Sequence, residues 1–60
     1  MYKDMNGNHI TLHTVVVTSR GDVYSVESIE PSREYMLKLR NGCCVSYDKA
    51  ENLEILTRTN

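Results

Sequence analysis

The fold is decided by residues 35 to 47, which read Tyr-Met-Leu-Lys-Leu-Arg-Asn-Gly-Cys-Cys-Val-Ser-Tyr. Two alternating apolar runs meet there across Asn41-Gly42, and this pattern is typical of a β-hairpin. The register of the hairpin determines which side chains face the interior, because a slip of one residue sends a strand's side chains to the opposite face.

Three loops connect the two runs in different registers. A two-residue loop of Asn41-Gly42 mixes polar and apolar side chains on both faces. A loop of residues 40 to 42 makes a type I turn closed by Gly42 with positive φ, which glycine adopts at little cost. This loop leaves one face wholly apolar or aromatic, so we expect it; a loop of residues 41 to 43 keeps nearly the same interior. The expected cross-strand pairs are Leu39 with Cys43, Leu37 with Val45 and Tyr35 with Tyr47.

This register separates an interior face from a possible binding face. The interior face carries Leu37, Leu39, Val45 and Tyr47, with Cys43 as a small core residue. The other face carries Met36, Lys38, Arg40, Cys44 and Ser46, which we take as the candidate partner-binding residues. Methionine and arginine are enriched in protein recognition surfaces. The alternatives are a solvated sheet face, or a face partly buried under the N-terminal segment or a second subunit.

The preceding sequence predicts two further strands. Residues 10 to 18 are rich in β-branched side chains and predict a strand that changes register near Thr14 or is covered on both sides. The inward side chains of this strand are expected to be Ile10, Leu12 and Val16. Residues 23 to 29 predict a second strand, in which Ile29 is out of phase with the earlier apolar residues. A bulge near Glu27-Ser28 brings Ile29 back to the interior face.

The remaining segments complete a small single domain. Residues 31 to 34 predict a loop, residues 48 to 51 a single helical turn and residues 53 to 56 a last short strand. We expect a flexible lead-in or a turn over residues 1–8, one β domain over residues 9–57 and a flexible C-terminus over residues 58–60.

Composition restricts the partners and the compartment. A chain of 60 residues buries only about 60% of its unfolded surface, so a partner or a second copy of the chain would add stability. Seven basic and eight acidic residues give a net charge of −1, so general attraction to phosphate is absent. No signal peptide or membrane-length apolar run is present, and the adjacent Cys43 and Cys44 are expected to be reduced thiols. We expect a cytoplasmic protein without a membrane partner.

Two kinds of reactive site receive little support from the sequence. His9, His13, Cys43 and Cys44 are potential zinc ligands, but they lack the close paired spacing of structural zinc sites. A Cys-His nucleophile pair needs an enclosed cleft, for which a 60-residue domain has little volume. We therefore expect no metal, no other cofactor and no enzymatic activity.

Three short segments carry a resemblance to a known superfold. They are Gly-Asp-Val-Tyr-Ser-Val at residues 21 to 26, Leu-Arg-Asn-Gly at residues 39 to 42 and Glu-Asn-Leu-Glu-Ile-Leu at residues 51 to 56. From about Val15 to Leu56 the chain resembles the SH3-like barrels, which include KOW, Tudor and Sm-type modules. The expected fold is all-β, a five-stranded, strongly bent antiparallel sheet or an SH3-like barrel with one helical turn before the last strand. The resemblance implies binding of proteins or nucleic acids rather than catalysis.

We expect a non-enzymatic protein-binding module, such as a small regulator or inhibitor of a larger protein. We expect a chain that begins at Met1 without a targeting segment and is too short for more than one task. Binding through a strand edge and homo-oligomerisation remain open. The alternative is a nucleic-acid-binding module of the KOW or Sm type, which requires exposed aromatic side chains beside clustered cations. The predicted aromatics mostly face inward, and the acidic residues expected near the cations are Glu27, Glu30, Glu34, Glu51 and Glu54.

Overall fold

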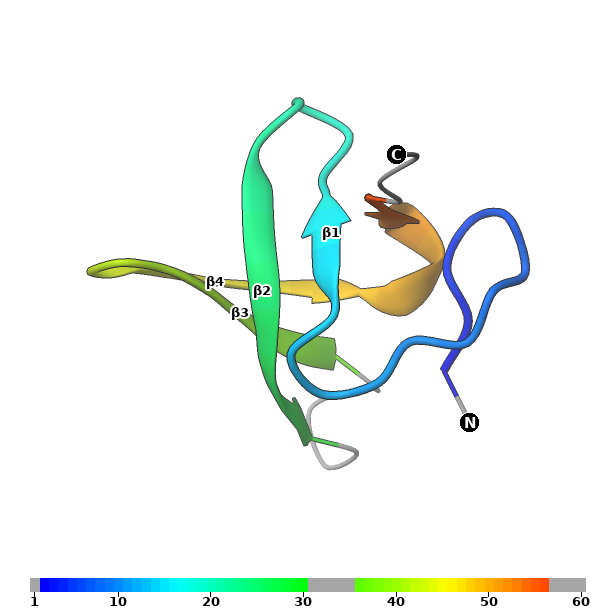
Figure 1. Cartoon of the computed structure of the whole chain (residues 1–60), viewed down its shortest axis with the longest axis horizontal. Coiled ribbons are helices and arrows are strands. Elements are labelled where there is room, and N and C mark those ends of the chain that lie inside the picture. The colour runs from blue at the N-terminus through cyan, green and yellow to red at the C-terminus, as the bar shows by residue number, and fades with distance from the viewer. Residues whose placement is uncertain (1, 31–35, 57–60) are drawn as a thin grey trace, which may run out of the picture.

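The computed structural model describes residues 2–30 and 36–56 of the chain as one antiparallel sheet (Figure 1). The elements are β1 (Val15–Val17), β2 (Val23–Glu30), β3 (Met36–Asn41), β4 (Cys44–Lys49), the 3-10 turn η1 (Ala50–Asn52) and β5 (Glu54–Ile55). The five strands lie in the order β4-β3-β2-β1-β5. The all-β class and the helical turn before the last strand are thus confirmed. The sheet is not closed, because β4 and β5 remain at its two edges.

The bulge that the sequence predicts in the second strand is present. Pairing of β2 with β3 shifts between Val26 and Ser28, which leaves Glu27 as the extra residue. Ile29 then lies opposite Leu37 and packs against the core. A bulge bends its strand and increases the local twist. The β1–β2 and β3–β4 hairpins consequently cross each other in Figure 1.

The β3–β4 hairpin has a register that differs from all three derived from the sequence. Its loop consists of Gly42 and Cys43, because Asn41 pairs with Cys44. Gly42 has a φ of +60°, and glycine with positive φ at the first central position is typical of a type II′ turn. The twist of this turn matches the twist of the flanking strands, so two residues suffice. The expected loop of residues 40 to 42 is therefore wrong, and Cys43 is exposed rather than in the core.

This register confirms the predicted interior of β3 and changes that of β4. Leu37 and Leu39 are fully buried, as expected. Val45 and Tyr47 instead lie opposite the two cations of β3, and Val45 is 43% exposed. Their predicted places in the interior are wrong, because the observed loop moves each residue of β4 along its partner strand. Tyr35, the expected partner of Tyr47, lies outside the described residues.

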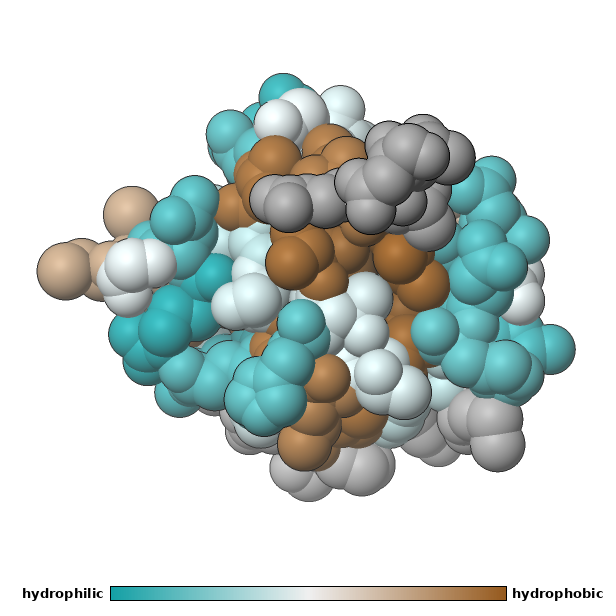
Figure 2. All heavy atoms as spheres, viewed as in Figure 1, coloured by the Kyte–Doolittle hydropathy of each residue, from teal (hydrophilic) through white to brown (hydrophobic). Residues whose placement is uncertain are grey.

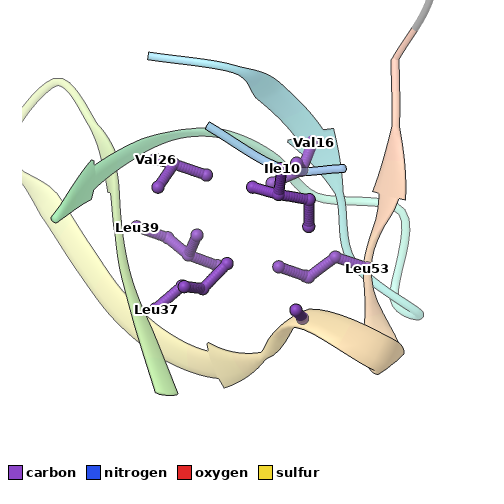
Figure 3. Packing of buried hydrophobic residues seen from close by; sticks show 7 residues of the cluster. Ile10, Val16, Val26, Leu37, Leu39 and Leu53 are labelled. Carbon is purple, nitrogen blue, oxygen red and sulfur yellow. The ribbon is translucent and has the colours of Figure 1, made fainter. Parts of the chain in front are cut away.

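Among the described residues, seven apolar side chains form the core and point toward one another in Figure 3. They are Ile10, Val16, Val26, Leu37, Leu39, Ala50 and Leu53. Four partly buried side chains pack around them: Tyr2, Tyr24, Ile29 and Ile55. The core thus combines residues from both hairpins, from the segment before β1 and from the region of η1.

The segment before β1 is not a continuous strand. Ile10 and Val16 are buried, as predicted, but Leu12 is 50% exposed. The chain turns over residues 11 to 14, where the Thr14 N–H donates to the Thr11 carbonyl and His13 has a φ of +69°. The change of register expected near Thr14 is therefore a complete turn, which moves Leu12 out of the interior.

Residues 2 to 10 form a hydrogen-bonded loop that lies beside η1 and β5 (Figure 1). Lys3 and His9 form an antiparallel bridge within it, and the Met5 N–H donates to the Leu53 carbonyl over 2.8 Å. The described residues contain no helix long and apolar enough to cross a membrane. The predicted loop of residues 31 to 34 and the C-terminal residues 58–60 lie outside the described part of the chain.

Asp4 connects this N-terminal loop to the last strand. Its carboxylate is almost fully buried, with 5% of the residue exposed. Oδ1 accepts hydrogen bonds from the N–H groups of Asn6 (2.9 Å) and Asn8 (2.8 Å), and Oδ2 accepts one from Ile55 (2.9 Å). These bonds lower the pKa of Asp4 because they stabilise its charged form, and the bond from Ile55 has the largest effect.

Candidate binding surface

The five residues of the predicted binding site do not share one face. Met36, Lys38 and Arg40 alternate along β3, as expected. Cys44 pairs with Asn41 and Ser46 pairs with Leu39, so both lie on the side of β3 that carries its buried leucines. Val45 and Tyr47 take their places beside the cations. We define the outer face of the sheet by Val15, Val17, Val23, Ser25, Met36, Lys38, Arg40, Val45 and Tyr47.

One line of paired residues crosses the outer face. Val45 lies opposite Arg40, Arg40 opposite Ser25, and Ser25 opposite Val15. The line continues to Leu56, directly after β5, because the Leu56 N–H donates to the Val15 carbonyl over 2.9 Å. Side chains from distant parts of the sequence therefore meet on one surface.

This surface exposes apolar side chains around a central arginine. Val15, Val23 and Val45 are 39%, 41% and 43% exposed, and Leu56 is 46% exposed. Hydrophobic atoms are visible over and beside β1 in Figure 2. A shallow hollow of about 260 Å³ lies where parts of β1 and β2 meet the β3–β4 tip. Its lining consists of Val15, Val23, Tyr24, Ser25, Arg40, Asn41 and Gly42.

Glu27 neutralises part of the positive charge on the outer face. Its carboxylate forms a salt bridge with Lys38 (Nζ to Oε2, 3.0 Å) and a second one with Arg40, whose Nη2 also donates to Oε2 over 3.3 Å. The hydrogen bond from Arg40, followed by that from Lys38, lowers the pKa of Glu27 to about 2. Glu27 in turn raises the pKa of both basic side chains. The three residues form an ion-pair cluster with a net charge of +1.

The bulge in β2 explains how one carboxylate reaches two cations. An extra residue in a strand re-aims its side chain relative to the regular alternation. The sequence predicted the bulge from the phase of Ile29 and placed Glu27 among the acidic residues near the cations. It did not predict that Glu27 pairs with both Lys38 and Arg40, because that contact depends on the register of β2 against β3.

The potential metal ligands named from the sequence lie on different elements. Cys43 and Cys44 are free and exposed at the β3–β4 tip. His9 lies in the N-terminal loop and His13 in the turn before β1. Within residues 2–30 and 36–56, no three histidine, cysteine, aspartate or glutamate side chains gather in a metal-binding group.

Comparison of the chain with protein-family models finds no match. Comparisons with curated proteins and with solved structures give no significant match.

Proposed function

We propose that this chain is a non-enzymatic protein-binding module that uses the outer face, and that it acts as a small regulator or inhibitor of a larger protein. The observation that carries the proposal is the group of exposed Val15, Val23 and Val45 around Arg40 on one side of a paired sheet. Arginine and well-packed apolar side chains supply much of the binding energy at protein interfaces. A paired sheet also holds such side chains in place before binding, which lowers the entropic cost of association.

The ion-pair cluster favours a protein partner over a nucleic acid. Binding to phosphates depends on cations that replace the counterions of the nucleic acid. Lys38 and Arg40 are already paired with Glu27, which stays ionised because its pKa lies at about 2. The phosphate backbone would have to compete with this carboxylate. The net charge of −1 gives no compensating general attraction.

The size of the outer hollow and the architecture agree with a binding role. Sites for whole small ligands usually have volumes of about 300–1,000 Å³. The hollow of about 260 Å³ therefore suits a side chain of a partner better than a complete small substrate. The five strands, the bulge in β2 and the turn η1 before β5 support the proposed resemblance to SH3-like modules in an open form.

Affinity capture with and without nuclease tests this proposal. We expect the native cell extract to yield a protein companion that resists nuclease and remains bound when the salt concentration is raised. The variant Val15→Thr/Val23→Thr/Val45→Thr keeps the β-branched shape but adds hydroxyl groups to the outer face, so it should lose this companion.

A second variant controls for general loss of surface hydrophobicity. Met5 and Leu12 are 51% and 50% exposed but belong to the N-terminal loop and the following turn. The variant Met5→Thr/Leu12→Thr should retain the companion. Capture that nuclease abolishes would contradict the proposal. Circular dichroism shows whether the valine variant is folded. If the folded variant still captured the companion, that result would also contradict the proposal.

A further inference from the structure

A polar cleft lies between the turn that joins β1 to β2 and the edge strand β4. Its volume is about 160 Å³. The lining includes Arg20, Asp22, Tyr24, Ser46, Tyr47 and Asp48. The bend of the sheet thus brings two segments together that are more than 20 residues apart in the sequence.

The charges of the cleft favour a cationic ligand. Asp22 stands on the β1–β2 side and Asp48 on the β4 side, while Arg20 is the one basic side chain among the described residues of the lining. These described residues carry a net charge of −1. This negative charge repels phosphate and other anions and attracts an ammonium or guanidinium group.

Asp48 is held in position for such a contact. Its Oδ1 accepts hydrogen bonds from the Lys49 N–H (2.8 Å) and from Asn52 Nδ2 (3.0 Å). A carboxylate has about four acceptor positions on its two oxygens, so these bonds leave capacity for a further donor. A carboxylate that is already oriented loses little side-chain entropy when it binds a cation.

Tyr24 adds an aromatic component to the same cleft. Its side chain is half-buried and packs against the core, which restrains the ring. Lysine and arginine are attracted to the face of an aromatic ring. The hydroxyl group of Ser46 in the lining is a further hydrogen-bond acceptor for a guanidinium or an ammonium group.

The neighbouring strand edge provides a place for the backbone of a partner. The edge at β5 is covered by the N-terminal loop, through the Met5 N–H to the Leu53 carbonyl (2.8 Å) and the Ile55 N–H to Asp4 (2.9 Å). β4 is the other edge of the described sheet, and it forms one wall of the cleft. An extended peptide can pair with such an edge while a side chain enters an adjacent site.

We propose that this cleft binds the basic side chain, lysine or arginine, of an extended segment of a protein partner. The inference rests on the proposed protein-binding role but concerns a second site, which has Tyr47 in common with the outer face. A volume of about 160 Å³ fits the charged end of one side chain and is below the usual size of a site for a nucleotide or a whole small ligand. Arg20 carries the same charge as the incoming side chain and repels it, so its removal should strengthen binding.

A peptide titration followed by amide NMR tests the proposal. The probe is a blocked five-residue peptide with a central arginine between alanines, and its control contains citrulline, a neutral analogue of arginine. We expect the arginine peptide to shift the amide signals of Asp22, Tyr24, Ser46 and Asp48, and the citrulline peptide to shift them far less. Equal shifts by both peptides, or shifts of the same amides by inorganic phosphate, would overturn the proposal.

Three variants should change the affinity for the arginine peptide in different directions. Asp48→Asn should weaken binding of the arginine peptide by about tenfold, the loss of one charge-assisted hydrogen bond. Arg20→Gln should strengthen binding. Glu51→Gln, an exposed residue of η1 that is not part of the lining, changes the net charge by the same amount as Asp48→Asn and should leave affinity unchanged. Unchanged binding by folded Asp48→Asn, or weaker binding by Arg20→Gln, would contradict the proposal.

The two surfaces can fail independently. The peptide titration needs no natural partner, so its result does not depend on affinity capture. Failure of the arginine peptide with successful, valine-dependent capture would refute the cleft alone. Specific peptide binding with failed capture would refute the outer face alone.

Discussion

Glu27 shows how the position of one residue in a bulge changes the character of a surface. The same extra residue that returns Ile29 to the core places a carboxylate between Lys38 and Arg40. Two cations that the sequence presents as available for a partner are therefore already paired. A partner can still contact them, but it must compete with Glu27 or accept the whole ion-pair cluster as one unit.

The ion-pair cluster predicts a specific dependence of stability on pH. The pKa of Glu27 is about 2 in the folded protein, against 4.5 ordinarily, so the folded state binds this proton more weakly than the unfolded state does. Its stabilising contribution is present above pH 4.5 and is lost as the pH falls toward 2. Glu27→Gln should therefore lose less stability over this interval than the wild-type protein does.

Thermal unfolding at a series of pH values measures this difference. Glu51→Gln is the matched control, because Glu51 lies in η1 and is not a member of the ion-pair cluster, and it should follow the wild type. Since the cluster is partly exposed, added salt should reduce the difference. A carboxyl titration of Glu27 by NMR with a midpoint near 4.5 would show that the ion pairs do not stabilise its charge in solution.

The β3–β4 hairpin shows how turn geometry controls the faces of a whole element. Gly42 with positive φ fits both the turn expected from the sequence and the turn observed, but at different positions of the loop. The observed two-residue loop buries Leu39 and leaves Val45 in solvent. The length of this loop therefore determines which side chains of β4 lie on the outer face.

Two alanine substitutions test the register. Leu39 is fully buried, so Leu39→Ala should lower the free energy of unfolding by about 2–5 kcal/mol through lost contacts and a cavity. Val45 is 43% exposed, so Val45→Ala should change it by no more than about 0.5–1 kcal/mol. Chemical denaturation measures both values. Similar losses for the two variants would instead support the register in which Val45 faces the interior.

At the scale of the whole molecule, Asp4 joins the N-terminal loop to β5, an edge strand of the sheet. The N-terminal loop covers the β5 edge, whereas β4 remains an edge beside the polar cleft. Covering an edge strand removes a site for unwanted pairing between chains. The loop therefore gives the two edges different properties, and β4 is the edge that no other described strand pairs with.

Asp4→Asn should loosen this connection. An asparagine side chain has one acceptor oxygen and presents an NH₂ group, so it cannot accept all three backbone N–H bonds that the buried carboxylate accepts. We expect a lower Tm and faster hydrogen exchange at the amides of Asn6, Asn8 and Ile55. Asp22→Asn, at an exposed position, is the control. Unchanged exchange at Ile55 would show that Asp4 does not hold β5 in solution.

Local patterns in the sequence were sufficient for much of the fold. Alternation predicted the buried Leu37 and Leu39, the phase of Ile29 predicted the bulge, and the last segment predicted a short strand after a helical turn. These features depend on contacts between near neighbours or on the burial of one strand face. The alternation on β3 also placed Lys38 and Arg40 on the face away from the core.

Only the tertiary structure decided the surroundings of those cations. The observed loop is one residue shorter than the expected loop, and this difference places Val45 and Tyr47 beside the cations instead of Cys44 and Ser46. The two-residue and three-residue loops differ too little in local geometry for the sequence to separate them. The contacts of Glu27, the anchoring of Asp4 and the polar cleft join segments that are distant in the chain. Each of these three features depends on how the bent sheet brings the segments together, so no local pattern in the sequence predicts them.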